Sequence, residues 1–301
     1  MLKIIISPAK KMRILEDYSC RLSAPVFQER AGQLHTALRN LSFEELKKLW
    51  NCSEKLAVQN YERLHAWVPG RHLTPALLAY EGIQYQYMAP HIFSESQWTY
   101  AEEHLRILSG FYGILRPTDG VIPYRLEMQA KLAPVREAFG SVNSLYEYWG
   151  DSIYRHLAAE MPADIDALQS TGPAAKTPAD ADALQSAGPA AKTPADADTL
   201  QIVNLASDEY SKSVLPFIAP SVTWVSCIFG ELADGRVKVK GTLAKMARGE
   251  MVRWMAENQI QDVRGLRDFR QLNYQFHEEL SSDRAYVFLK SPEGGHRGVF
   301  R

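Results

Sequence analysis

The order in which helical and strand patterns follow one another most constrains the fold of this chain of 301 residues. Apolar positions with helical spacing dominate the first half, for example over residues 26–41, whereas most strand patterns come later. The main strand candidates are residues 2–7, 201–206, 221–232, 272–276 and 285–289. Segregated helices and strands are typical of the α+β class. We therefore predict the α+β class with a mixed or largely antiparallel sheet, in a chain long enough for one large domain or two ordinary ones.

Composition excludes several classes of protein. With 46% hydrophobic and 10% aromatic residues, the chain can form a sizeable core and is globular. No apolar run approaches the roughly 18–20 residues of a membrane span, and the isoleucine run near the start is too short for a signal peptide. The cysteines Cys20, Cys52 and Cys227 lie far apart, which fits a reducing cytoplasm and disfavours a zinc site. The chain also lacks GxGxxG, GxSxG and HExxH motifs. We predict a cytoplasmic protein with no metal, cofactor or membrane partner.

Residues 163–201 differ in composition from the rest of the chain. The unit ADIDALQSTGPAAKTP is followed by ADADALQSAGPAAKTP and by the truncated ADADTLQ, and the two full units share 14 of 16 residues. Alanine, proline, aspartate and glycine offer little to bury, so we predict a disordered tandem-repeat insertion within the domain. The paired aspartates lack the glycine and the distal glutamate of a calcium loop, so we expect no metal there.

The net charge of −1 conceals a segregation of charge along the chain. Six aspartates and two lysines in residues 163–201 carry a local charge of −4, which leaves +3 on the remainder. Residues 236–253 contain six basic residues and one acid, Glu250. Such a segment is either solvated surface or part of a patch that binds phosphate, because a local patch can do so whatever the total charge.

Glycine and proline punctuate the stretch HLRILSGFYGILRPTDGVIPYRLEM, residues 104–128. Ala101, Leu105 and Leu108 have helical spacing, and Gly110 and Gly113 interrupt the apolar run that Pro117 ends. We predict a helix, a glycine hairpin and a short second helix. Bare N–H groups in such a hairpin suit a phosphate. The alternative is a helical corner that packs in the core, with its glycines as C-caps.

Small polar turns follow two of the strand candidates, at residues 7–10 and 207–212. The carboxyl ends of strands collect ligand sites in open sheets. If these two strands are neighbours, one cleft gathers Ser7, Lys10, Ser207, Asp208 and Lys212. Such a set suits an oxyanion, and a serine with a desolvated lysine can also form a nucleophile pair. In the alternative, Ser207 and Asp208 cap a helix and the lysines are solvated surface charge.

Seven segments together resemble one protein family. They are ISPAK at 6–10, SEKLA at 53–57, HLRILSGFYGILRP at 104–117, PYRLEM at 123–128, LYEYWGD at 145–151, NLASDEYSKSV at 204–214 and KMARGEMVRWMAEN at 245–258. In this order, and over nearly the whole chain, they resemble the YaaA peroxide-stress protein family. The resemblance implies a cytoplasmic bacterial protein of hydrogen-peroxide defence that limits oxidative damage to DNA and protein and is linked to lowering unincorporated iron. It also implies a single compact α+β domain over residues 1–301, with a positively charged cleft and a helix–hairpin–helix DNA-binding element. No enzymatic activity is firmly attached to the family.

The resemblance further implies where DNA would bind. The helix–hairpin–helix corresponds to residues 105–116, and the implied DNA-binding residues are Gly110, Tyr112, Gly113, Arg116, Lys10, Lys212, Lys245 and Arg248. Contacts of this kind to the phosphate backbone tolerate any sequence.

Two hypotheses about function remain open at this stage. One is a DNA-binding stress protein. The other is an unassigned enzyme that acts on a phosphorylated or damaged nucleotide held by Ser7, Lys10, Asp208 and Lys212, which would have to lie within hydrogen-bond reach of one another. A third, direct binding of iron, has few clustered ligands in the sequence to support it.

Overall fold

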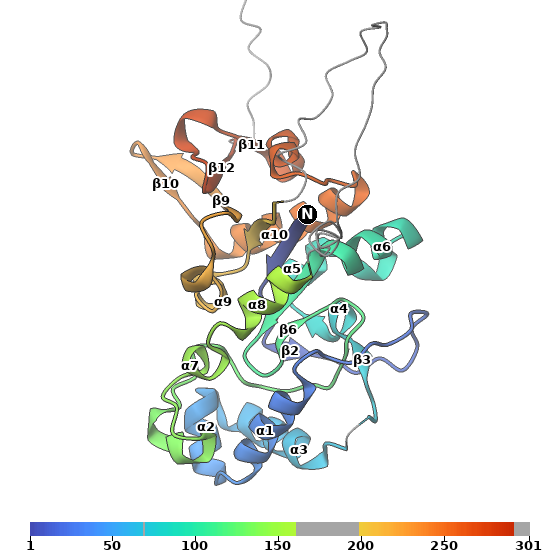
Figure 1. Ribbon diagram of the computed structural model, residues 1–301, viewed down its shortest axis with the longest axis vertical. Coiled ribbons are helices and arrows are strands. Elements are labelled where there is room, and N and C mark those ends of the chain that lie inside the picture. Colours follow the sequence, from blue (N-terminus) through green and yellow to red (C-terminus); the bar gives the residue numbers. More distant parts are fainter. Residues whose placement is uncertain (69, 161–198, 292–301) are drawn as a thin grey trace, which may run out of the picture.

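The computed structural model describes residues 1–68, 70–160 and 199–291 (Figure 1). The predicted repeat insertion falls almost wholly outside these residues, so its disorder stays a prediction. The helices are α1 Gln28–Arg39, α2 Phe43–Trp50, α3 Glu54–Ala66, α4 Ala76–Ala79, α5 Ile83–Met88, α6 Glu95–His104, α7 Leu145–Trp149, α8 Ser152–Ala159, α9 Asp208–Ser211 and α10 Gly241–Glu257. The strands are β1 Leu2–Ile6, β2 Lys11–Met12, β3 Thr74–Pro75, β4 Tyr80–Glu81, β5 Leu105–Ser109, β6 Gly113–Leu115, β7 Gly120–Val121, β8 Gln201–Leu205, β9 Thr223–Ala233, β10 Arg236–Lys238, β11 Tyr274–Phe276 and β12 Ala285–Lys290.

The main sheet is mixed, as predicted, and has the strand order β11-β12-β9-β8-β1-β5-β6, with β10 paired to β9. Its centre is parallel, because β12, β9, β8, β1 and β5 all run in the same direction. Antiparallel pairing in this sheet occurs where β6, β10 and β11 join it. The expectation of a largely antiparallel sheet is therefore wrong at the centre. Helices and loops connect the parallel strands, as parallel pairing requires.

The predicted helix–hairpin–helix at residues 105–116 is a β-hairpin. Helix α6 ends at His104, Leu105 has extended backbone angles, and β5 pairs with β6 through Ile107↔Leu115 and Ser109↔Gly113. All five residues of β5 are buried, so both faces of this strand are covered. Such a strand has a nearly continuous apolar sequence, which periodicity alone does not distinguish from a buried helix. The glycines serve the turn, because Gly113 has φ +74° and a Cβ at Gly110 would meet the backbone of Leu126.

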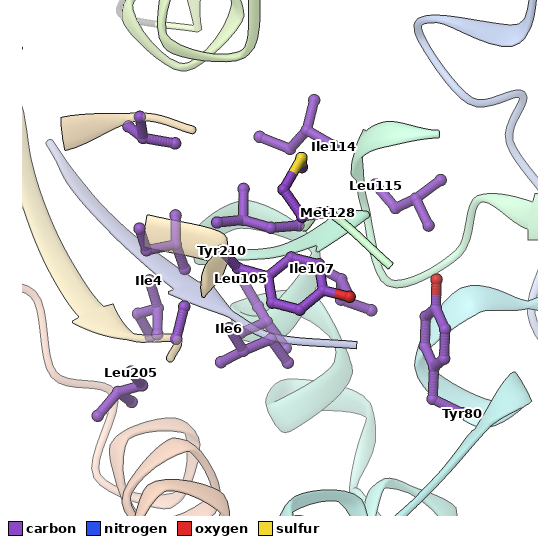
Figure 2. Packing of buried hydrophobic residues seen from close by; sticks show 14 of the residues in the cluster. Ile4, Ile6, Tyr80, Leu105, Ile107, Ile114, Leu115, Met128, Leu205 and Tyr210 are labelled. Atoms are coloured by element: carbon purple, nitrogen blue, oxygen red, sulfur yellow. The ribbon is translucent and has the colours of Figure 1, made fainter. Parts of the chain in front are cut away.

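Strand β1 lies at the centre of the core. All five of its residues are buried, and β5 and β8 flank it. Figure 2 shows Ile4 and Ile6 of β1 among Leu105 and Ile107 of β5 and Leu205 of β8. At one end of the molecule α1, α2 and α3 lie together, and β9, β10 and β12 lie at the other (Figure 1).

An ion cluster of Lys3, Arg106, His156 and Glu160 ties the end of α8 to strands β1 and β5. The Arg106 guanidinium donates to both carboxylate oxygens of Glu160, with Nη2 2.8 Å from Oε1, and Lys3 Nζ lies 2.8 Å from Oε2. His156 Nε2 lies 3.3 Å from the same carboxylate. The side chains of Lys3 and Arg106 are only 4% and 5% exposed, so this cluster is a buried ion network.

Local turns and helix caps are formed by the residue types that favour them. Ser42 and Glu45 form a capping box at the start of α2. Asp234 and Gly235 both have positive φ in the turn between β9 and β10, as expected for a two-residue hairpin.

None of the helices described is long and apolar enough to span a membrane. Over the same part of the chain, no three histidine, cysteine, aspartate or glutamate side chains gather as a metal site.

Candidate functional site

A cleft opens at the carboxyl ends of β1 and β8, and we call it the β1–β8 cleft. The chain leaves β1 toward β5 on one side and leaves β8 toward β9 on the other, so the two connections diverge at this point of the sheet. Ligands in open parallel sheets bind at such topological switch points. The cavity has a volume of about 400 Å³ and is lined from both strand ends, α5, α10 and residues 124–127. This volume falls within the range of small-molecule sites.

Two serines join the strand ends at the base of the cleft. The backbone N–H of Ser207 donates to Ser7 Oγ at 2.8 Å, and the two hydroxyl oxygens lie 3.2 Å apart. The backbone carbonyl of Ser7 accepts a hydrogen bond of 3.0 Å from Tyr85. The condition set for a shared cleft, that the first strand and the strand before residue 207 are neighbours, is met, since β1 pairs with β8.

Helices α5 and α10 form a fixed wall of the cleft. A Cβ at Gly249 would overlap the carbonyl oxygen of Gln84, so the two helices pack backbone to backbone there. A Cβ at Gly82 would likewise touch Ala9 in the turn after β1. Gly82 and Gln84 line the cavity on one side, and Lys245 and Arg248 of α10 line it too. The glycines bring these groups close to the strand ends.

Buried tyrosines lie beneath and around the cavity. Tyr85, Tyr124 and Tyr210 line it, and Tyr124 shares hydrogen bonds with Ser109 at 2.6 Å and Tyr80 at 2.8 Å. Because Ser109 Oγ already accepts from two backbone N–H groups, its own hydrogen is donated to Tyr124. Burial raises the pKa of Tyr124 to about 12, so its hydroxyl is neutral at physiological pH.

Some of the charged groups at the rim neutralise one another. Glu127 accepts from Lys10 at 2.7 Å through one oxygen and from Arg125 at 3.1 Å through the other. Lys11 pairs with Glu81 at 2.9 Å. The amine of Lys10 is thus engaged by Glu127, and it forms no nucleophile pair with Ser7 in this arrangement.

Arg248 and Lys245 have no anionic partner within the described residues. Both lie on α10, three residues apart, and neither forms an ion pair or hydrogen bond with that part of the chain. The Nε atom of Arg248 is buried and has no hydrogen-bond partner. Burial lowers the pKa of Arg248, against the opposing influence of Cys227 and Asp208, although an arginine still remains charged. Free positive charge in the cleft therefore comes from α10.

Glu209 is the corresponding free anion of the cavity. It lines the cavity, and its Oε1 accepts from the backbone N–H of Gln129 at 3.3 Å. No lysine, arginine or histidine in the described residues lies within ion-pair distance of it. Burial raises the pKa of Glu209, and the neighbouring carboxylate of Glu127 acts in the same direction.

The structure separates the predicted site residues into two groups. Five of them line the cleft together: Ser7, Lys10, Ser207, Lys245 and Arg248. The others do not line it. Asp208 and Lys212 are exposed beside α9, although the charge of Asp208 reaches Arg248. The predicted catalytic set of Ser7, Lys10, Asp208 and Lys212 is therefore not gathered in one cavity.

The glycine hairpin, for which DNA contacts were predicted, is buried in the structure. Gly110, Tyr112 and Gly113 are buried, and Tyr112 accepts a hydrogen bond from the backbone of Ile122. A buried β-turn cannot present its N–H groups to a nucleic acid. Arg116 lies outside the cleft, where it bonds Asp119 at 3.4 Å and lies 3.9 Å from Glu102.

Sequence reasoning missed several residues of the cleft. Gln84, Tyr85, Tyr124, Arg125, Glu127 and Glu209 all line it. The segment PYRLEM, residues 123–128, stood out as a family signature but gave no sign of its place, since only tertiary folding brings it to the ends of β1 and β8. Glu209 carried a usable signal, because it follows Ser207 in the polar turn.

Comparison with known proteins places the chain in a family. A family profile described as "Peroxide stress protein YaaA" matches residues 2–171 and 182–280. A UPF0246 protein of Desulfitobacterium hafniense (strain Y51) is 43% identical over 290 residues, which cover 96% of this chain and 98% of that protein. A UPF0246 protein of Lactiplantibacillus plantarum is 42% identical over 288 residues, covering 96% and 99%. Because these sequence matches extend over most of its length, the chain belongs to the peroxide stress protein YaaA family.

Proposed function

We propose that this protein acts in the peroxide stress response by binding DNA at the β1–β8 cleft, through contacts to backbone phosphates that tolerate any sequence. The observation that supports the proposal best is the pair of unpartnered cations Lys245 and Arg248 beside the Ser7–Ser207 strand ends. Phosphate contacts supply most of the affinity in sequence-tolerant binding. The cavity is lined by five basic and three acidic side chains, so positive charge prevails there.

The buried β5–β6 hairpin has no part in this proposal. Side chains of the cleft would bind the phosphates. The exposed Lys212, just after α9, would extend this phosphate-binding surface. Binding would limit oxidative damage by covering DNA, and we propose that the effect on unincorporated iron implied by the family resemblance is an indirect one.

Fluorescence anisotropy with labelled duplex, single-stranded and bubble DNA across a salt series tests the proposal. Binding should weaken as salt rises, with a slope of log affinity against log salt of roughly 0.9 per phosphate neutralised on duplex DNA. Lys245→Glu should reduce that slope by about 1. The matched control is Lys55→Glu, an exposed lysine on α3 outside the cleft. Binding that is absent at low salt, or equal for both variants, would contradict the proposal.

A second candidate function is an enzyme acting on a phosphorylated or damaged nucleotide. The cavity volume of about 400 Å³ favours it, because this volume suits a single nucleotide. The acid–base candidate in this cavity is Glu209, whose pKa burial raises, in place of the unformed Ser7–Lys10 pair. Incubation of the protein with nucleotides and oxidised nucleotides, followed by chromatography of the products, tests this candidate. Turnover that Glu209→Gln abolishes would support it, and unchanged nucleotides after long incubation would count against it.

A further inference from the structure

Two side chains of opposite charge in the β1–β8 cavity, Arg248 and Glu209, have no ion-pair partner among the described residues, in addition to the exposed Lys245. Arg248 has a buried Nε without a hydrogen-bond partner, and no carboxylate of the described chain lies within ion-pair distance of it. Glu209 receives a hydrogen bond from the backbone of Gln129 but has no bonded cation in the same part of the chain. Buried charged and polar groups are normally paired, so each such exception requires an explanation.

These two groups do not neutralise each other across the cavity. The groups that influence Arg248 are the Cys227 thiol of β9 and the carboxylate of Asp208, the first residue of α9. Those that influence Glu209, the next residue of α9, are Glu127 and Lys10, which pair with each other at the rim. The cavity therefore has a cationic part formed by α10 and an anionic part around Glu209. A ligand that satisfies both must carry an anion at one end and hydrogen-bond donors at the other.

We propose that the cavity binds a single unstacked nucleotide, with its phosphate on Arg248 and the exocyclic amine of its base on Glu209. The inference rests on the proposed function, which supplies a nucleic acid as the source of that nucleotide, and it names the part of the ligand that enters the cavity. Adenine, cytosine and guanine carry an exocyclic amine, whereas thymine presents a carbonyl oxygen at the corresponding position. The cavity should therefore discriminate against thymine.

The remaining lining fits this ligand. Guanidinium groups bind phosphate through charge-assisted hydrogen bonds, and the hydroxyls of Ser7 and Ser207 lie in the same cavity. Tyr124, which is more exposed than the other lining tyrosines, offers aromatic surface to a base. A nucleotide taken out of its strand in this way costs unstacking energy, which the two newly paired charges offset.

Titration calorimetry with free nucleotides tests the inference directly. The probes are dAMP, dCMP, dGMP and dTMP, with deoxyadenosine as the ligand that lacks a phosphate. At least one amine-bearing nucleotide should bind about tenfold more tightly than dTMP. dAMP should bind more tightly than deoxyadenosine, and Arg248→Met should remove that preference. Should Arg248→Met fold poorly, Arg248→Lys retains the charge without Nε and should weaken dAMP several-fold. Glu209→Gln should bring dTMP to parity, because an amide can donate to the thymine carbonyl.

Two control arms separate this inference from the proposed function. Lys55→Glu should leave every nucleotide affinity unchanged. Oligo-dA and oligo-dT, titrated beside duplex DNA, show whether the nucleotide is taken from a strand. If DNA binds with the expected salt slope but dTMP equals the other nucleotides, or none of them binds, the inference is overturned and the proposed function stands. If free nucleotides bind in an Arg248-dependent way and no DNA binds, the ligand class stands and the proposed function fails.

Discussion

Arg106 in the ion cluster and Arg248 in the β1–β8 cleft are both largely buried arginines, yet only Arg106 has a carboxylate partner. Arg106 donates to both oxygens of Glu160 and also to the backbone carbonyls of Glu102 and Leu105. Arg248 has a buried Nε that bonds nothing in the described chain. A buried charge with an ion-pair partner is compatible with a stable fold, whereas an unpaired buried charge lowers the free energy of unfolding. Such unpaired charges are typical of ligand-binding sites. The two regions thus predict opposite responses to the same kind of change.

The largest effect is expected from Glu160→Ala, which converts the ion cluster into a second region of unpaired charge. It leaves Lys3 and Arg106 buried without a carboxylate, so the free energy of unfolding should fall by about 3–5 kcal/mol. Urea denaturation measures the change. Glu137→Ala, at an exposed pair with Arg136, is the control and should alter stability by less than about 1 kcal/mol. A loss as small as that of the control would contradict the comparison.

Acid should reproduce part of this effect in the unmutated protein. Burial alone would raise the pKa of Glu160, but hydrogen bonds from His156, Arg106 and Lys3 outweigh it and hold that pKa well below its ordinary value of 4.5. A depressed carboxyl pKa contributes stability that is complete above the unfolded-state pKa and is lost as pH falls through the folded-state pKa. Stability should therefore decline progressively below about pH 4.5. Glu160→Gln should flatten this decline, and an identical acid profile in the variant would show that other groups cause it.

A smaller effect of opposite sign is expected in the cleft. Arg248→Met removes a buried charge that has no partner, so the free energy of unfolding should stay unchanged or rise by about 1 kcal/mol. The same urea denaturation measures it, and the loss of ligand binding described above should accompany it. A marked loss of stability would mean that Arg248 supports the fold as Arg106 does.

The smallest expected effect concerns Cys227, whose thiol lies near Arg248. Burial raises the pKa of Cys227 to about 12, and the opposing influence of Arg248 does not offset it. Thiols react with peroxide as thiolates, so this cysteine should remain reduced at neutral pH. Mass spectrometry of the folded protein after peroxide treatment should find Cys227 unmodified, whereas the urea-unfolded protein should be modified. Rapid oxidation in the folded state would overturn this prediction.

Local signals predicted much of the fold. The α+β class, the buried strand at the start of the chain, the strand before Ser207 and the turn at Asp234 and Gly235 all follow from apolar patterns and turn residues. The prediction was wrong for β5, which was expected to be helical. A strand covered on both faces lacks the alternation of apolar and polar residues that distinguishes a strand from a helix. The ion partner of Arg106, Glu160, is 54 positions away in the sequence, so no local pattern marks Arg106 as a buried residue of a strand.

The candidate site was predictable where strand ends define it and not elsewhere. Ser7 and Ser207 follow directly from two strands that pair, so the sequence placed both. Glu127 and Tyr124 reach the cleft only through the path of the chain after β7, which no local pattern specifies. Lys212 does not line the cavity for a different reason. It directly follows the short helix α9 and is exposed on the surface.

The contact between Gly249 and Gln84 has a consequence for how fast the cleft can be occupied. Because the backbones of α5 and α10 are in direct contact there, the two helices have little freedom to move relative to each other when a ligand binds. A preorganised site of this kind needs no rearrangement on binding, so little ordering entropy is lost and no slow isomerisation limits association. Long-range steering by the charges of α10 would then set the association rate constant, and added salt should act on that rate far more than on the lifetime of the complex.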